Sequence, residues 1–160
     1  MEDTVIMQTF IIGMGNTLLS DHGAGIYALN FLKNFHSDIP GTKYLNGEFL
    51  ELDLATKIEP TNNLIVIDAT NLNSQPGSVH TFVGNEMDSI LNEQSKNASQ
   101  EKGLVQLLKE IDLLDRLPER RALVGIQPLC LDEGECLSAT VEDAIPNVCC
   151  RVLGLIEEWH

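Results

Sequence analysis

The sequence predicts an α/β fold, in which five strands alternate with helices along one chain of 160 residues. Two apolar runs, residues 10–12 and 64–67, have the composition of strands that are buried on both faces of a sheet. Stripes of apolar residues at helical spacing follow these runs, and short turns rich in Gly, Pro and Asn separate the segments. The length fits one compact domain, 1–160, with a sizeable core.

The first predicted strand, residues 8–12, leads into the loop that carries the most informative residues of the chain. Gly13 and Gly15 end this strand, at a point where the backbone must turn sharply or let another group approach closely. Asn16 can hold such a turn by bonding to its own backbone. A buried strand followed by a tight turn is a common way for α/β proteins to build a site.

Two side chains that can bind metal or carry protons, Asp21 and His22, stand just before a predicted helix over 23–35. Asp21 is expected to cap the N-terminus of this helix, because a carboxylate satisfies free backbone N–H groups there. The helix should bury one face, formed by Ile26, Leu29, Leu32 and Phe35.

The middle of the chain holds a second candidate site residue. A short strand at 43–45 precedes an Asn46-Gly47 turn and a helix over 48–55, and the clearest strand follows at 63–70. Asp68 falls at the carboxyl end of that strand, where ligands bind in open α/β sheets if the strand order reverses. A carboxylate among apolar residues must find a partner, which favours a functional role for Asp68 near His22.

The second half of the chain continues the alternation. We expect a strand at 78–84, with His80 as an ordinary strand histidine, a helix over 86–94 and a polar stretch at 95–100. A helix over 103–111, a strand at 120–128, an acidic loop and a last helix opening near 137–141 follow. Pro146 fits an early turn of the last helix or a kink. The buried face of that helix should contain Ile145, Val148, Cys149, Val152 and Ile156.

Charge and cysteine content exclude several classes of function. Ten Lys and Arg against 24 Asp and Glu give a formal net charge of −14, which disfavours nucleic acid and anionic membrane surfaces as partners. No apolar run approaches the ~20 residues that span a bilayer, and the acidic N-terminus does not resemble a signal peptide. The four cysteines form no zinc motif, and we expect buried or partly buried thiols in a reducing cytoplasm: Cys130, Cys136, Cys149 and Cys150.

The pattern Gly13-x-Gly15-Asn16-x-Leu18-x-x-Asp21-x-Gly23-x-Gly25 resembles the N-terminal signature of the hydrogenase maturation endopeptidases. Later segments also resemble this family, including Val124-Gly125-x-x-Pro128 and the Leu137-Ser138 opening of the last helix. The resemblance implies a three-layer sandwich, in which a mixed five-stranded sheet with one antiparallel strand lies between helices. It also implies an endopeptidase that removes the C-terminal extension of a nickel-loaded [NiFe] hydrogenase large-subunit precursor, acting as a cytoplasmic monomer without an organic cofactor.

The same resemblance implies roles for individual residues. Nickel, carried by the precursor, would be contacted by His22, Asp68 and Gln100, and the first two would be catalytic. The substrate would be bound by the signature loop and the following turn: Gly13, Gly15, Asn16, Asp21 and Asn46. The chain departs from the family in three places: His22 replaces an acidic residue, Gln100 replaces a histidine, and Asn46-Gly47-Glu48 keeps only part of an Asp-Gly-Gly-Thr-like turn.

Other catalytic classes find little support in the residues. The signature lacks the third glycine of a dinucleotide site, and no Gly-x-Ser-x-Gly nucleophile elbow occurs. Imidazole and carboxylate suit nickel or zinc, and the attacking group would be water, activated by the metal or by Asp68. The altered ligand positions leave a second interpretation open, in which the chain binds a metalloprotein precursor or metal as a maturation factor without cutting it.

Overall fold

The computed structural model of the protein describes residues 8–49, 54–95 and 102–159. The strands are β1 (Thr9–Gly13), β2 (Thr42–Asn46), β3 (Asn63–Ala69), β4 (Val79–Val83) and β5 (Arg120–Ile126). The helices are η1 (Ser20–Gly23) and η2 (Gly47–Phe49), both 3₁₀, together with α1 (Ala24–Phe35), α2 (Leu54–Lys57), α3 (Asn85–Ser95), α4 (Lys102–Leu113) and α5 (Ala139–Trp159).

The five strands form one mixed sheet in the order β2-β1-β3-β5-β4. The first four of these pair in parallel, and the edge strand β4 runs antiparallel to β5. Gly13 of β1 pairs with Asn46 on one side and Ile67 on the other, so the loops after these three strands meet at the same edge of the sheet. The strand order therefore reverses between β1 and β3, which is where α/β sheets bind ligands.

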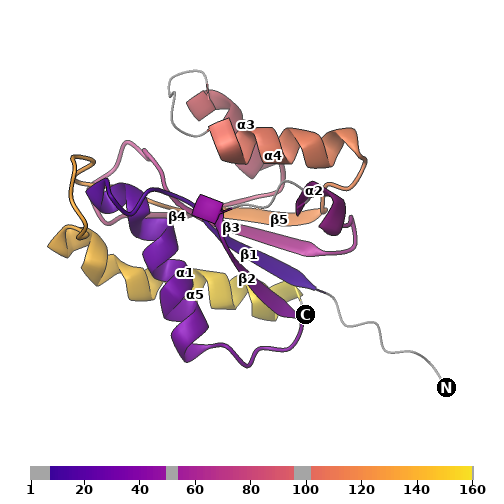
Figure 1. Ribbon diagram of the computed structural model, residues 1–160, viewed down its shortest axis with the longest axis horizontal. Helices are drawn as coiled ribbons and strands as arrows, with labels where there is room; N and C mark the ends of the chain where they lie inside the picture. Colours follow the sequence, from indigo (N-terminus) through magenta and orange to yellow (C-terminus); the bar gives the residue numbers. More distant parts are fainter. Residues whose placement is uncertain (1–7, 50–53, 96–101, 160) are drawn as a thin grey trace.

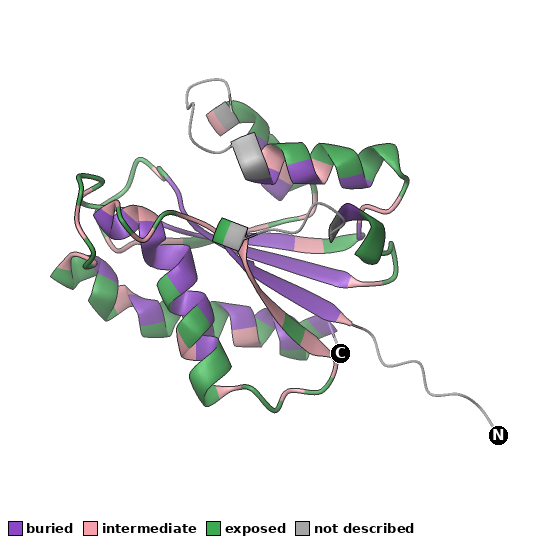
Figure 2. Cartoon of the chain, in the orientation of Figure 1, coloured by how far each residue is buried: buried purple, intermediate pink, exposed green. Residues whose placement is uncertain are grey.

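Helices cover both faces of this sheet, as Figure 1 shows, with α1 and α5 on one side and α3 and α4 on the other. Alternate residues of β3 point to the two layers because side chains of a strand alternate between faces. Ile65 and Ile67 pack with the α1–α5 cluster, and Leu64 and Val66 pack with the α3–α4 cluster. Every residue of β1 and β3 is buried (Figure 2), which explains their continuous apolar sequences. The predicted three-layer α/β sandwich is thus confirmed.

Most predicted elements are found within one or two residues of their expected bounds, but three expectations are wrong. The expected helix over 48–55 is absent as such: residues 47–49 form η2, α2 begins only at Leu54, and 50–53 lie outside the described residues. Phe35, expected on the buried face of α1, is 68% exposed. Cys136 and Cys150 are exposed, whereas Cys149 is buried; all four cysteines are free thiols.

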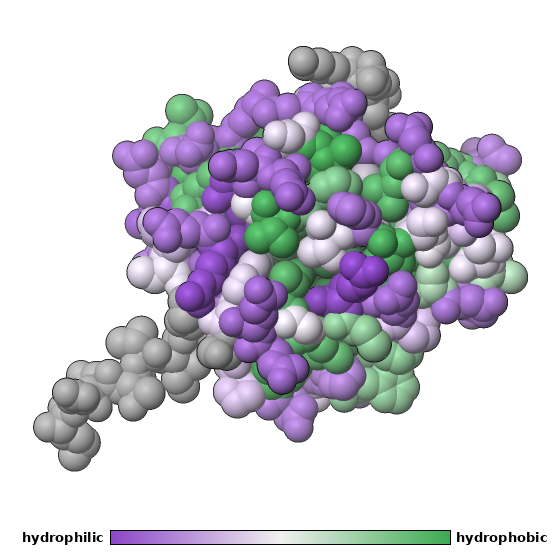
Figure 3. All heavy atoms as spheres, turned by 180° about the vertical axis from the view of Figure 1, so that it is seen from behind, coloured by the Kyte–Doolittle hydropathy of each residue, from purple (hydrophilic) through white to green (hydrophobic). Residues whose placement is uncertain are grey.

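Seen from behind in Figure 3, hydrophilic side chains cover much of this face, with hydrophobic ones in patches between them. Among the residues described, no helix is both long enough and apolar enough to cross a membrane.

Candidate active site

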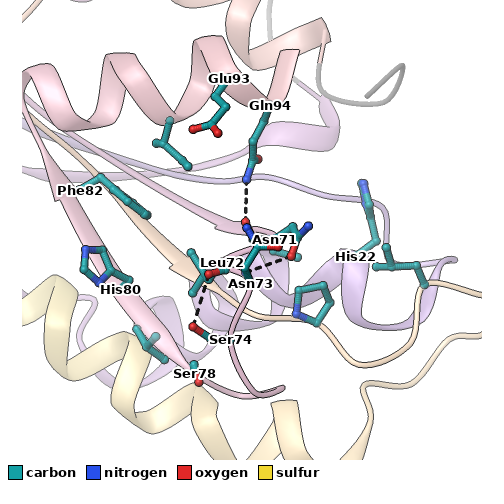
Figure 4. Close-up of a pocket in the computed structure, with 15 residues that line it drawn as sticks. His22, Asn71, Leu72, Asn73, Ser74, Ser78, His80, Phe82, Glu93 and Gln94 are labelled. Carbon is teal, nitrogen blue, oxygen red and sulfur yellow. Dashed lines mark hydrogen bonds between the residues drawn. The ribbon is translucent and has the colours of Figure 1, made fainter. Parts of the chain in front are cut away.

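A cavity of about 620 Å³ opens at the carboxyl ends of the central strands. Its wall includes His22 from η1, Ala69 at the end of β3 and Asn71 after it, His80 and Phe82 of β4, and Glu93 of α3. Figure 4 shows His22 at one end of this cavity and His80 with Phe82 at the other. The cavity therefore extends from the point where the strand order reverses to the edge strand of the sheet.

The signature loop is shaped by backbone contacts that only glycine permits. Gly15 has φ +132°, and a Cβ at this position would collide with the carbonyl oxygen of His22. A Cβ on Gly13 would lie 2.7 Å from Cβ of Leu29, so this glycine lets α1 lie against β1. Asn16 holds the turn as predicted, because its Oδ1 accepts the Leu18 amide at 2.9 Å. The signature glycines are thus explained by close packing.

His22 is held by this loop with one ring nitrogen already engaged. Its Nδ1 accepts the backbone N–H of Asn16 at 2.8 Å. Because a backbone N–H can only donate, Nδ1 carries no proton, and the neutral ring therefore carries its proton on Nε2. Burial lowers the pKa of His22 below its ordinary value, which favours the neutral ring. In this arrangement Nε2 is a hydrogen-bond donor, and binding a metal there requires the proton to move.

Asp21 does not cap α1, contrary to the expectation from the sequence. The residue before α1 is Gly23, which has no side-chain cap, and Asp21 points instead to the loop before α5. Its carboxylate is fully buried and accepts amides from Leu129 and Cys130, each at 2.9 Å, and both the amide and the hydroxyl of Ser138. Burial by itself would raise the pKa of Asp21, but these hydrogen bonds outweigh it and hold the pKa below its ordinary value.

Asp68 lies at the end of β3, beside the elements that hold His22. The amide of Met14 donates to the carbonyl of Ile67 at 2.8 Å, and η1 packs against β3, so the two candidate catalytic residues sit on neighbouring segments. Asp68 is only 3% exposed, and the cavity wall includes its neighbour Ala69 but not Asp68 itself. On β3, Asp68 shares the face of Leu64 and Val66, which is the α3–α4 side.

The turn after β2 is joined to the signature loop by Glu48, a residue to which the sequence assigned no role. Oε1 of Glu48 accepts the amide and the hydroxyl of Thr17 at 2.9 and 3.1 Å. Asn46, a predicted substrate-binding residue, uses its Oδ1 to accept the Glu48 amide at 2.8 Å and so shapes this turn. Gln100, the third predicted metal contact, lies outside the described residues.

Several residues that line the cavity were not singled out from the sequence. His80 was expected to be an ordinary strand histidine, yet it lines the cavity together with Asn71, Glu93 and Gln94. Helical spacing places Glu93 and Gln94 on the same face of α3 as Ile90, and alternation places His80 and Phe82 on the same face of β4. Only the antiparallel pairing of β4, which the residues themselves do not reveal, brings these two faces together.

Comparison with known proteins identifies the family. The family model described as hydrogenase maturation protease matches residues 32–155, which is more than half of the chain. The hydrogenase expression/formation protein HupD of Bradyrhizobium diazoefficiens is 29% identical over 153 residues, covering 93% of this chain and 78% of HupD. The hydrogenase 2 maturation protease of Escherichia coli is 24% identical over 153 residues, covering 95% of this chain and 92% of that protein.

Solved structures show the same fold. The hydrogenase maturating endopeptidase HybD of E. coli superposes with a TM-score of 0.84 at 23% identity, covering 95% of this chain and 93% of HybD. The [NiFe] hydrogenase maturation protease HybD of Thermococcus kodakarensis gives a TM-score of 0.69 at 25% identity, covering 93% and 99% of the two chains. The family expected from the sequence is confirmed, and the chain belongs to the hydrogenase maturation protease family.

Proposed function

We propose that this endopeptidase removes the C-terminal extension of a nickel-loaded [NiFe] hydrogenase large-subunit precursor. The observation that carries the proposal is the cavity at the carboxyl ends of the strands, with His22 in its wall and Asp68 on the adjoining strand end. The family and its named relatives support the same substrate class. The nickel belongs to the precursor and reaches the site with it.

In this proposal Asp68 and His22 are the catalytic residues, and Gln100 is a further contact for the nickel. Asp68 binds nickel or accepts a proton from the attacking water, as a carboxylate can do both. His22 offers Nε2, either as a donor to the carbonyl of the scissile bond while Nδ1 holds the Asn16 amide, or as a nickel ligand once the proton has moved. Both uses require a neutral imidazole, which burial of His22 favours.

The signature loop and the turn after β2 are proposed to receive the precursor. Gly13, Gly15 and Asn16 shape the loop, Asn46 shapes the turn, and Asp21 anchors the acidic loop beside them. The partner is the large-subunit precursor, and we place the reaction in the cytoplasm with the protease as a monomer that needs no organic cofactor. Light scattering of the purified protein tests whether it is a monomer.

The test mixes purified protein with nickel-loaded precursor and measures the mass of the large subunit. We expect a short C-terminal peptide to be lost with the wild type and retained with Asp68→Asn, which preserves the shape of the buried side chain. Asp143→Asn, at an exposed position of α5, serves as the matched control and should cleave normally. A precursor that stays intact but binds would contradict the endopeptidase and support the non-cleaving maturation factor.

A further inference from the structure

The end of the cavity away from His22 is formed by two facing surfaces. One face of β4 contributes Phe82 and His80, whose ring centroids lie 4.5 Å apart with the ring planes tilted by 50°. The facing side of α3 contributes Glu93 and Gln94. In Figure 4 the side chains of Glu93 and Gln94 extend from α3 into the cavity, across from Phe82 and His80. We refer to Phe82, His80 and Glu93 as the Glu93 subsite.

The chemistry of this subsite suits a cation. Glu93 makes no hydrogen bond or ion pair with any other residue that the structure describes, so its carboxylate is available to a ligand. The described wall of the cavity contains neither Lys nor Arg. An aromatic ring beside a carboxylate binds ammonium and guanidinium groups through the face of the ring and through charge. An anionic side chain would be repelled by Glu93 and by the net charge of −14.

The helix that carries Glu93 is fixed on both sides of this residue. Asp88 forms a two-pronged ion pair with Arg121 of β5, with the Arg121 Nε and a terminal nitrogen 3.0 and 2.5 Å from the two carboxylate oxygens. Gln94 donates its side-chain amide to the carbonyl of Asn71 at 3.2 Å. Because Arg121 is committed to Asp88, it does not neutralise Glu93. The backbone of α3 is thus fixed on both sides of Glu93 before a ligand arrives, which keeps this carboxylate on the side of α3 that faces β4.

We propose that the Glu93 subsite binds one Lys or Arg side chain of the precursor's C-terminal extension, and so helps to select the substrate. This inference rests on the proposed function, because the cavity continues from the His22 end to the Glu93 subsite. An extended peptide that passes His22 can place a side chain between α3 and β4. The Glu93 subsite lies at the end of the cavity away from His22 (Figure 4) and therefore contributes to binding of the precursor more than to the chemical step.

Steady-state cleavage of nickel-loaded precursor tests the subsite. Glu93→Gln should raise KM about tenfold and change kcat less, since the substitution removes the charge that pairs with the cation and leaves the ring of Phe82 in place. The rise in KM should shrink at 1 M salt, which screens charge. Glu86→Gln, an exposed carboxylate in the first turn of the same helix and outside the cavity wall, is the control and should leave KM unchanged.

A charge exchange identifies the cationic side chain. Each Lys or Arg of the extension is replaced in turn by Glu, and one replacement should reproduce the rise in KM. Combining this replacement with Glu93→Lys should bring KM most of the way back to the wild-type value, whereas combining it with Glu86→Lys should not. The proposal is overturned if Glu93→Gln leaves KM unchanged, or if no charge exchange brings KM back towards the wild-type value.

Failure of the proposed function gives a different result. If the wild type cleaves no precursor, affinity is measured instead with the Asp68→Asn variant, by the fluorescence anisotropy of labelled precursor. The Glu93 subsite then predicts the same tenfold weakening and the same restoration by charge exchange in Kd. If these variants leave the Kd for the precursor unchanged, the proposed Glu93 subsite is overturned independently of cleavage.

Discussion

Asp21 and Ser138 are 117 residues apart in the sequence and are joined by two hydrogen bonds. The Ser138 amide donates to Oδ1 over 2.7 Å, and its hydroxyl donates to Oδ2 over 2.8 Å. The same hydroxyl oxygen accepts the Val141 amide at 3.4 Å, so Ser138 also caps the first turn of α5. One buried carboxylate therefore fixes the acidic loop and the start of the last helix to the signature loop.

Replacing Asp21 by Asn should destabilise the protein by about 3 kcal/mol, because a buried –NH₂ would face backbone amides that need an acceptor. Urea denaturation of the variant and the wild type at pH 7 measures this difference. Asp143→Asn, an exposed change of the same chemistry, should alter the free energy of unfolding by less than about 0.5 kcal/mol. Equal effects of the two substitutions would contradict an anchoring role for Asp21.

Two substitutions of His22 separate the functions of its two nitrogens. Asn places an acceptor near Nδ1 and should keep the bond from Asn16, but it removes the group at Nε2. Gln places an amide near Nε2 and can still donate there. If Nε2 donates to the substrate, His22→Asn should lower kcat/KM about 100-fold and His22→Gln should lower it less. If Nε2 binds nickel, both substitutions should lower kcat/KM by the same factor. Measured rates of precursor cleavage decide between the two outcomes.

The activity should depend on pH through His22. Its folded-state pKa lies below the ordinary value of 6.5, so the folded protein holds this proton less readily than the unfolded chain. The neutral ring therefore contributes stability that is complete above about pH 6.5 and is lost as pH falls through the folded pKa. We expect kcat/KM to decline as pH falls through the folded-state pKa of His22, which lies below 6.5, because protonation of Nδ1 breaks the bond from Asn16. This acid limb should be absent from the pH profile of His22→Gln.

Glu48 should matter for the turn after β2, because its carboxylate accepts both the amide and the hydroxyl of Thr17. Glu48→Gln keeps one acceptor but loses the charge, and should cost about 1 kcal/mol of stability. Thermal unfolding measures this cost, with the exposed Glu59→Gln as control. Hydrogen exchange of the Thr17 amide gives an independent readout, and unchanged protection there would argue against the contact.

The sequence by itself determined the elements that local composition can encode. The apolar runs of β1 and β3 predicted buried strands because parallel strands covered on both faces expose no polar side. Apolar spacing predicted the buried faces of α1, α4 and α5. The glycine-rich signature resembled that of the family, and in the structure its glycines stand where other chain segments approach too closely for a Cβ. The position of Asp68 at a strand end also followed from the sequence alone.

Only the tertiary structure decided which distant residues meet. Asp21 looked like a helix cap because the helix is its neighbour in sequence, but the fold supplies stronger partners from a loop 117 residues away. The contacts of Glu48 and the Glu93 subsite could not be predicted from the sequence for the same reason. Their contacts depend on strand order and on the direction of β4, and hydrophobic periodicity, which reports whether a side chain faces the core, carries no information about which segment lies opposite.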